Sequence, residues 1–268
     1  MTRTMRGIEF KTPREIELMR RAGHILADLM DRLREFVKPG MSTLDVDVEV
    51  EQFITSRGAR PAFKGYRGFP ATVCISINEE VVHGIPSPQR RLRAGDIVGL
   101  DLGCIVEGYY ADCAFTTALG DVPAPVRKLL DVTRESLDRA IEQCWPGRRL
   151  SDVSHAVQAH VEAHGFGVVR AFVGHGIGRA LHEEPQIPNF GDPGRGPQLK
   201  PGMVFAIEPM VTMGSWEVRV LDDGWTAVTK DGSLAAHFEH TIAITDQGPD
   251  VLTSKNGRPA PAAAERPR

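Results

Sequence analysis

The stretch LRAGDIVGLD, residues 92–101, has a counterpart in LKPGMVFAIE, residues 199–208. Both stretches begin with leucine, carry glycine at the fourth position and end an apolar run with a carboxylate. These carboxylates, Asp101 and Glu208, are 107 residues apart. Acidic side chains are rarely buried without a partner, so the pattern points both to a repeat and to a site.

Two Pro-Gly pairs repeat at the same spacing. Residues 39–40 and 146–147 are again 107 residues apart, and each pair separates two segments with helical periodicity. Equal spacing in two separate patterns indicates a duplicated helix, helix, strand unit. We therefore predict an α+β fold in a single domain of residues 1–253. Its two pseudo-symmetric halves, about residues 12–119 and 120–250, would face each other and bring the two carboxylates towards a shared axis.

Capping residues mark where the helices should begin. Small polar residues suit the N-cap position, and proline suits the first helical turn. The expected helix starts are Thr12 with Pro13, Ser42 or Thr43, and Ser151. Residues 254–268 are rich in Pro, Ala and Arg and lack apolar periodicity, which predicts a disordered C-terminal tail.

The composition is that of a globular, enzyme-sized chain. The 268 residues are 41% hydrophobic and 25% charged, with a net charge of -3, so no basic excess predicts binding to nucleic acid. No apolar run approaches the ~20 residues that cross a bilayer, and the N-terminus lacks the apolar core of a signal peptide. Four cysteines without a CxxC pair favour reduced thiols over a zinc ribbon. We expect a cytoplasmic protein.

The stretch GLDLGCIVEGYYADCAFTT, residues 99–117, has the pattern of a β-hairpin that turns at Glu107 and Gly108. A two-residue turn fixes which residues face each other. The facing pairs are Asp101 with Ala114 and Asp112 with Gly103. Both aspartates then share one face, roughly 7 to 8 Å apart at the backbone, and Gly103 would leave open space opposite Asp112.

Two aspartates on one half-buried face would repel, and one would take up a proton unless a cation lay between them. The hairpin alone would favour a pair of solvent-facing aspartates on an edge strand. Two more carboxylates in apolar strand-like runs, Glu208 and Glu239, favour the metal interpretation. The Gly-rich segment after residue 173 adds His175 and His182. A lone histidine there would favour a structural role, but four neighbouring carboxylates favour a nitrogen ligand.

This set of ligands favours particular metals and one kind of reaction. Carboxylates with one imidazole suit Mn, Fe(II), Co or Zn, and four carboxylates carry enough charge for two divalent ions. Two such ions can activate water at neutral pH and polarise a carbonyl. From the residues alone we infer hydrolysis of an amide.

Five segments occur in order along the chain: NEEVVHGIP, DLGCIVEGYYAD, GHGIGRALHEEP, FAIEP and FEHTIAI. Together they closely resemble the type I methionine aminopeptidases of bacterial style, in metallopeptidase family M24, from about Ile8 to Leu252. The resemblance implies the pita-bread fold, in which two pseudo-symmetric halves enclose a dinuclear site. It also implies metal-dependent removal of the N-terminal methionine from nascent proteins when the second residue is small.

The resemblance also implies a metal site. The implied cofactors are two divalent ions from among Co, Mn, Fe(II), Zn and Ni. The implied ligands are Asp101 on one ion, His175 and Glu208 on the other, and Asp112 and Glu239 bridging both.

Further roles follow from the same resemblance. Glu208 would accept the proton of the nucleophile, His83 would lie near the scissile nitrogen, and His182 would steady the carbonyl oxygen. The pocket for the methionine side chain would be formed by Tyr66, Phe69, Cys74, Leu181 and Trp225. Phe63 and Leu181 differ from the residues that are common at these positions in the family, so the resemblance does not fix the exact shape of this pocket.

Two other functions fit parts of the pattern. Prolidases, aminopeptidase P and creatinase share the fold but generally carry an extra N-terminal domain, whereas the first predicted helix here already belongs to the repeated unit. A non-catalytic scaffold for nucleic acid or ribosomes would have lost metal ligands, and all five positions are filled. The expected partners are N-terminal methionine peptides and nascent chains, with a transient ribosome association. We expect a monomer with no stable nucleic-acid or membrane partner.

Overall fold

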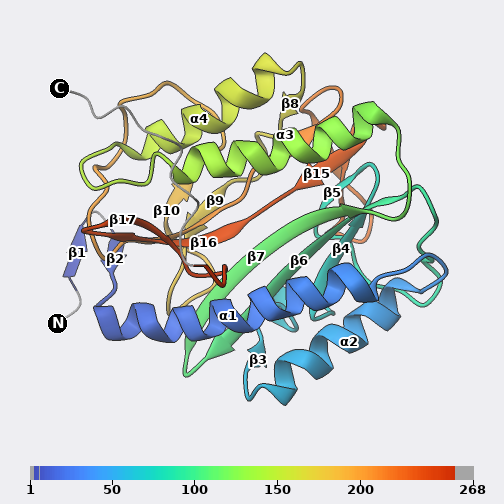
Figure 1. The fold of residues 1–268 in the computed structure, drawn as a ribbon, viewed down its shortest axis with the longest axis horizontal. Helices are drawn as coiled ribbons and strands as arrows, with labels where there is room; N and C mark the ends of the chain where they lie inside the picture. The colour runs from blue at the N-terminus through green and yellow to red at the C-terminus, as the bar shows by residue number, and fades with distance from the viewer. Residues whose placement is uncertain (1–2, 6, 257–268) are drawn as a thin grey trace.

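The computed structural model describes residues 3–5 and 7–256, in which helices lie along two sides of a set of strands (Figure 1). The helices are α1 (Pro13–Phe36), α2 (Thr43–Ser56), α3 (Ala124–Ile141) and α4 (Leu150–Ala163), with a 3₁₀ turn η1 (Tyr66–Gly68). In Figure 1, α1 and α2 lie below the strands and α3 and α4 lie above them. Both predicted pairs of helices are therefore present.

The first two helices begin where their capping residues predict. The Thr12 hydroxyl accepts a hydrogen bond from the Glu15 N–H (3.3 Å), and the Glu15 carboxylate accepts one from the Thr12 N–H (2.7 Å). Ser42 and Asp45 form the same reciprocal pair at α2, at 3.2 and 2.8 Å. Each pair satisfies two N–H groups that the helix itself leaves free.

The predicted start of α4 is wrong, because Arg149 takes the N-cap position two residues before Ser151. The helix begins at Leu150, and the Asp152 carboxylate accepts a hydrogen bond from the Arg149 N–H (2.8 Å). Ser151 lies inside the first turn, where its hydroxyl accepts a hydrogen bond from the Arg195 N–H (2.7 Å). A serine near a helix start can therefore bind a distant loop instead of capping the helix.

Two larger sheets carry the predicted strands, and smaller sheets surround them. The first contains β3 (Arg60–Pro61), β4 (Val73–Ile77), β6 (Ile97–Val106) and β7 (Tyr109–Ala118), in the order β3-β6-β4 with β7 paired to β6. The second, in the order β10-β9-β11-β16-β17, contains β9 (Gly174–Gly176), β10 (Glu183–Ile187), β11 (Val204–Ile207), β16 (His240–Thr245) and β17 (Gly248–Val251). The smaller sheets join β15 (Ala235–His237), β12 (Met210–Thr212) and β8 (Gly167–Val168); β13 (Val218–Val220), β14 (Ala227–Thr229) and β5 (Glu80–Val82); and β1 (Arg3–Met5) with β2 (Ile8–Phe10).

Matching backbone hydrogen bonds reveal the repeat. The Gly40 N–H donates to the Leu92 carbonyl (2.8 Å), and 107 residues later the Gly147 N–H donates to the Leu199 carbonyl (3.0 Å). Both glycines have φ of +93°, a left-handed conformation that favours glycine. These equivalent contacts support a repeated helix, helix, strand unit. The boundaries of the halves, and of the domain at residue 253, stay predictions.

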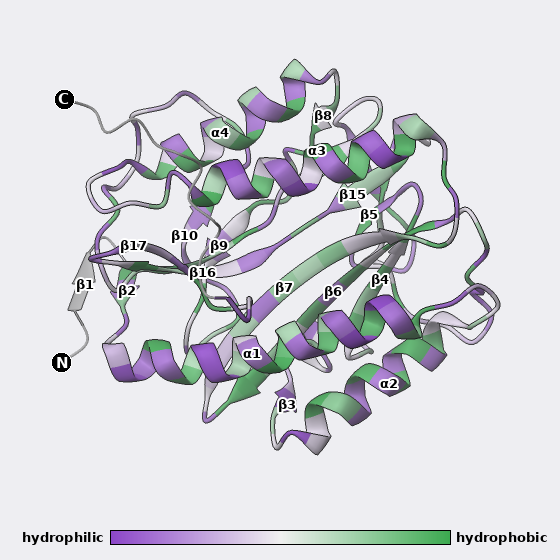
Figure 2. Ribbon diagram, in the orientation of Figure 1, coloured by the Kyte–Doolittle hydropathy of each residue, from purple (hydrophilic) through white to green (hydrophobic). Residues whose placement is uncertain are grey.

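Each pair of helices covers its own hydrophobic core. Leu26 of α1 and Leu100 of β6 belong to one buried cluster, and Leu129 of α3 and Phe205 of β11 belong to the other. Figure 2 shows hydrophobic and hydrophilic residues alternating along α1 and α3, as expected for helices with one buried face. Phe238 packs against both clusters, so the two cores meet beside the break between β15 and β16.

The hairpin of β6 and β7 has the predicted register and turn. Glu107 and Gly108 have φ of +50° and +84°, as a two-residue hairpin turn requires. The facing pairs are Asp101 with Ala114 and Asp112 with Gly103. The expected open space at Gly103 is wrong, because a Cβ there would lie 2.5 Å from the Phe63 ring. Gly103 is needed because Phe63 covers it.

The helices and the C-terminal residues each add one observation. Within the described part of the chain, no helix is both long and apolar enough to span a membrane. Lys255 pairs with Asp28 (2.9 Å) and Asp31 (2.7 Å) of α1, so the first residues of the predicted tail contact the body. Residues 257–268, which make up the rest of that tail, lie outside the described residues.

Candidate active site

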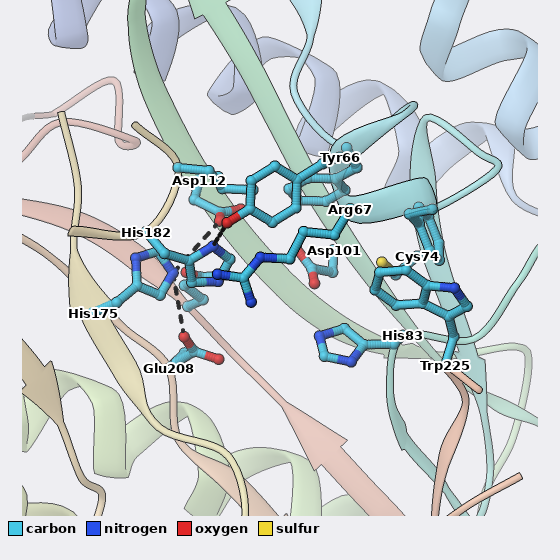
Figure 3. Close-up of a pocket in the computed structure, with 14 residues that line it drawn as sticks. Tyr66, Arg67, Cys74, His83, Asp101, Asp112, His175, His182, Glu208 and Trp225 are labelled. Atoms are coloured by element: carbon cyan, nitrogen blue, oxygen red, sulfur yellow. Dashed lines mark hydrogen bonds and ion pairs between the residues drawn. The ribbon is translucent and has the colours of Figure 1, made fainter. Parts of the chain in front are cut away.

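The β6–β7 hairpin contributes Asp101 and Asp112 to the lining of one pocket (Figure 3). Asp112 is only 4% exposed. Its N–H donates to the Thr241 hydroxyl (3.0 Å), and the same hydroxyl donates to the Asp112 carbonyl (2.7 Å). Because Thr241 belongs to β16, the second sheet holds the backbone of Asp112 in place.

Glu208 and Glu239 reach the same pocket from the second half of the chain. Both were expected inside strands, but Glu208 follows the end of β11 and Glu239 lies in the break between β15 and β16. The Glu208 carbonyl accepts a hydrogen bond from the Asn189 amide (2.9 Å). The Glu239 backbone exchanges hydrogen bonds of 2.9 and 3.3 Å with Ala114 of β7. The carboxylates therefore lie where strands end or break, and both positions are fixed through the backbone.

His175 enters the pocket from β9, between two glycines. A Cβ on Gly176 would lie 2.1 Å from the Glu184 carbonyl oxygen, so glycine is required for β9 and β10 to approach. The His175 Nδ1 lies 2.9 Å from the Gly176 carbonyl, which leaves Nε2 free to face the carboxylates. This Nε2 lies 3.6 Å from Glu208 Oε1 and 3.9 Å from Asp112 Oδ2 (Figure 3).

The cluster fits a divalent cation. One ligand atom from each of Asp112, His175 and Glu239 lies within 4.8 Å of the other two. Single carboxylate oxygens of Asp101, Asp112 and Glu239 are buried without a hydrogen-bond partner among the described residues. Such groups cost free energy when buried, and a bound cation offsets that cost.

The pKa values in the cluster support the same conclusion. Burial raises the pKa of Asp101 to about 7. Burial, together with repulsion from neighbouring carboxylates, raises the pKa of Asp112, Glu208 and Glu239 well above the usual range. Burial lowers the pKa of His175 to about 4, so its imidazole is neutral at pH 7, the form that binds metals. A cation that binds here would therefore displace protons from the carboxylates.

His83 lines the pocket with a strained backbone. Its φ is +62°, which is uncommon for residues other than glycine and typical of functional positions. The ring meets Phe172 edge-on at 5.4 Å and Trp225 at 6.2 Å. Burial lowers the pKa of His83, so this ring is also neutral at pH 7.

His182 lies between Tyr66 and His175. Its ring stacks on Tyr66 at 5.3 Å between centroids and lies 4.2 Å from the His175 ring. The Tyr66 hydroxyl is 2.8 Å from His182 Nδ1 (Figure 3). Burial, and to a lesser extent electrostatic interactions with His175, Arg67 and His83, lowers the pKa of His182 to about 3. The ring is neutral and its Nδ1 is engaged.

The apolar residues expected around the methionine side chain gather beside these polar groups. All of them line the pocket: Tyr66, Phe69, Cys74, Leu181 and Trp225. Phe69 and Trp225 meet edge to face at 5.1 Å, a favourable aromatic geometry. Cys74 faces Asp101 across two paired strands, and burial, then the nearby carboxylates, raises the pKa of its thiol. One wall of the pocket is therefore apolar and the adjacent wall is acidic.

The structure adds residues in and beside the pocket that the sequence analysis did not identify. Arg67 lines the pocket, and Phe172 contacts His83. His237 Nε2 is buried without a hydrogen-bond partner among the described residues and lies 3.7 Å from Glu208 Oε2. The two-residue periodicity of strands could have indicated His237, because it precedes Glu239 by two positions. No pattern indicated Arg67.

The sequence analysis also did not identify a buried ion pair. The Lys11 ammonium pairs with the Glu183 carboxylate, and both side chains are nearly inaccessible to solvent. Glu183 also accepts hydrogen bonds from the N–H groups of Arg179 (2.7 Å) and Ala180 (3.2 Å). These contacts hold the loop that leads to His182. No sequence pattern relates residue 11 to residue 183.

This fold, with its buried cluster of carboxylates and histidine, defines a metallopeptidase. The profile of metallopeptidase family M24 matches residues 17–246, and the chain belongs to that family. Within it the chain groups with the methionine aminopeptidases. Methionine aminopeptidase 1 of Bacillus subtilis is 53% identical over 243 residues, which are 91% of this chain and 98% of the relative. The Clostridium acetobutylicum methionine aminopeptidase is 52% identical over 246 residues, 92% of this chain and 98% of the relative.

Solved structures agree with these relatives. The methionine aminopeptidase from Thermotoga maritima superposes with a TM-score of 0.91 at 49% identity, covering 92% of this chain and 100% of that one. The prolidase from Pyrococcus furiosus superposes with a TM-score of 0.73 at 25% identity and covers 92% of this chain but 65% of its own. The predicted α+β pita-bread fold is confirmed.

Proposed function

We propose that the protein is a metal-dependent aminopeptidase that removes methionine from the N-terminus of peptides and nascent proteins when the second residue is small. The observation that carries this proposal is the apolar wall formed by Phe69, Leu181 and Trp225 beside the acidic cluster. An apolar enclosure of this kind suits a long, unbranched and polarizable side chain. The methionine aminopeptidases among its relatives support the choice of methionine.

The family and the buried cluster indicate dependence on a divalent metal. We propose two ions, drawn from Co, Mn, Fe(II), Zn or Ni, since carboxylate and imidazole ligands suit these metals. The proposed ligands are Asp101 for one ion, His175 and Glu208 for the other, and Asp112 and Glu239 for both. When bound, such ions polarise a carbonyl and lower the pKa of water.

The side chains around the cluster have proposed roles in moving protons and holding charge. Glu208 would accept the proton of the attacking water, because its carboxylate lies in the cluster beside His175 and His237. His83 would contact the scissile nitrogen, and Phe172 supports its ring. When the Tyr66 hydroxyl donates to His182 Nδ1, the neutral ring carries its proton on Nε2 and can donate it to the carbonyl oxygen.

The cellular setting is part of the proposal. Methionine at a chain's N-terminus first becomes accessible as the nascent chain leaves the ribosome. We therefore propose a cytoplasmic monomer that associates only transiently with the ribosome.

The first test is the choice of substrate. Met-Ala-Ser should be cleaved with a kcat/KM at least ~10²-fold higher than Met-Lys-Ser, because His83 and His182, which line the pocket, would crowd a large second residue. Norleucine should replace methionine with little loss, since it has a similar shape. N-acetylated Met-Ala-Ser should not be cleaved, because acetylation adds bulk beyond the methionine. Steady-state kinetics on the four peptides measures this, and equal rates for the Ala and Lys peptides would contradict the proposal.

The second test is metal removal at two pH values. A chelator should lower the Tm of the protein by about 5–10 °C at pH 7.5 and by less at pH 5.5. The pKa of Asp101 in the metal-free folded protein is about 7, above its ordinary value of 3.8. Below pH 7 the metal must therefore displace a proton, so stabilisation by metal is present above this pKa and is lost as the pH falls through it.

Scanning calorimetry with and without EDTA measures the shift. EDTA already saturated with the same metal is the control for effects of the chelator itself. A shift that is absent at pH 7.5, or larger at pH 5.5, would contradict a metal bound by these carboxylates.

A further inference from the structure

An unusual turn carries Arg67 at the pocket. Gly65, Arg67 and Gly68 have φ of +85°, +48° and +89°, so three of the four residues 65–68 have a left-handed backbone. Hydrogen bonds from the Gly65 N–H to the Phe69 carbonyl (2.8 Å) and from the Phe69 N–H to the Tyr66 carbonyl (2.9 Å) hold this turn. It places Tyr66 and Phe69 in the pocket lining and Arg67 between them. A non-glycine residue in this conformation is typical of functional positions.

The Arg67 side chain is solvent-exposed while it lines the pocket. Its guanidinium carbon lies 5.4 Å from the centre of the Tyr66 ring, a cation–π contact. Figure 3 shows the side chain extending over the pocket in the direction of His182, whose pKa its charge helps to lower. Among the described residues, the guanidinium has no ion-pair or hydrogen-bond partner. A free positive charge therefore lies on the solvent side of the pocket.

The carboxylates that line the same pocket do not neutralise this charge. Asp112 and Glu239 are 4% and 2% exposed, and all four carboxylates have proposed roles as metal ligands. Arg67 therefore faces whatever enters from solvent. A peptide with its methionine in the apolar pocket and its second residue beside His83 and His182 must continue outwards past this rim.

We propose that Arg67 is a specificity-determining residue that binds a carboxylate on the peptide downstream of the cleaved bond, and so favours substrates with an acidic third residue. This inference rests on the proposed aminopeptidase function. A guanidinium is suited to the task because its fork of N–H groups matches a carboxylate. An extended peptide advances ~3.3 Å per residue, so the third residue lies within reach of a long side chain anchored at the rim.

The test compares three peptides with amidated C-termini: Met-Ala-Ser-Ser, Met-Ala-Glu-Ser and Met-Ala-Lys-Ser. Amidation removes the terminal carboxylate, so any charge preference belongs to the third residue. For the wild-type enzyme, kcat/KM should be about two- to tenfold higher for the Glu peptide than for the Lys peptide at low salt, mainly through KM. The preference should shrink in high salt because the contact is exposed.

Variants at this position separate charge from backbone strain. Arg67→Gln should bring the Glu-to-Lys ratio near one, Arg67→Glu should invert it, and Arg67→Lys should keep part of it. Gln, Glu and Lys are all non-glycine residues with an unbranched Cβ, so the left-handed backbone should strain the three replacements equally. Arg148→Gln is the matched control, because Arg148 is exposed in the loop between α3 and α4 and lies outside the pocket lining. It changes the net charge by the same amount as Arg67→Gln and should leave the Glu-to-Lys ratio as in the wild type.

The outcomes separate this inference from the proposed function. If the wild-type enzyme does not cleave Met-Ala-Ser-Ser amide, the proposed function fails. If it cleaves this peptide and the Glu-to-Lys ratio is near one, or is the same in Arg67→Gln, only the role of Arg67 is overturned. A ratio that changes equally in Arg148→Gln would assign the preference to net charge and also overturn that role.

Discussion

Replacing Asp112 with asparagine is expected to lower kcat/KM by at least ~10³-fold while the protein stays folded. This is more than the ~10–100-fold typical for residues that only support a ligand, because a proposed bridging ligand itself is lost. Asparagine has the same shape but no negative charge and only one oxygen. The hydrogen bonds between the Asp112 backbone and the Thr241 hydroxyl do not involve the side chain of Asp112, so the hairpin should keep its position.

Metal content and stability complete this test. The Asp112→Asn variant should bind fewer than two ions per chain, as measured by mass spectrometry of metals. Without metal, it should melt at or above the temperature of the metal-free wild type, because one of four clustered carboxylates that repel one another is gone. Asp121→Asn changes an exposed aspartate and should match the wild type in all three measurements. Full activity with two bound ions in Asp112→Asn would contradict the bridging role.

Backbone regularity explains what could be predicted from the sequence. Asp101 faces Ala114 because the hairpin has a two-residue turn and side chains alternate between the two faces of a strand. Both are local rules. The repeat was accessible for a similar reason, since Gly40 and Gly147 are required by the same left-handed backbone in each half. Where a constraint repeats at a fixed period, residues alone reveal it.

Local rules could not provide the arrangement around the hairpin. Phe63 covers Gly103 because a separate segment folds back onto the sheet. The space that the glycine suggested is therefore filled by the Phe63 ring. Ser151 suits an N-cap, yet a loop from residue 195 takes its hydroxyl and the helix begins earlier. In both cases a contact between distant parts of the chain overrides a local preference.

Some features of the candidate site could likewise be predicted from the sequence, and others could not. Glu208 and Glu239 stood out because a carboxylate at an apolar strand position is costly, and the structure brings both into one pocket. That His175 lies 3.6 Å from Glu208 follows from the pairing of β9 with β11, which no spacing in the sequence predicts. Arg67 gave no signal at all, because an exposed arginine before a glycine is ordinary in sequence, and this one is unusual only in its φ of +48°.

The second large effect is expected for His182→Ala, which should lower kcat by ~10²-fold and change KM little. The reason is that His182 is proposed to donate a hydrogen bond from Nε2 to the carbonyl oxygen as negative charge develops there. A contact that strengthens only in the transition state contributes to kcat and not to binding of the substrate. Steady-state kinetics on Met-Ala-Ser, with metal content checked for both proteins, measures the two constants.

Tyr66→Phe tests the tautomer on which this role depends. The Tyr66 hydroxyl lies 2.8 Å from His182 Nδ1, and its loss should leave the ring stacked but free to carry its proton on either nitrogen. We expect kcat to fall by ~10-fold, which is less than in His182→Ala because the ring can still donate part of the time. In a double variant the Tyr66 substitution should add almost nothing, since it acts through His182. If the two effects multiply, Tyr66 contributes by itself. If His182→Ala raises KM and leaves kcat unchanged, the ring only binds the substrate, and the carbonyl oxygen must receive its hydrogen bond from another group.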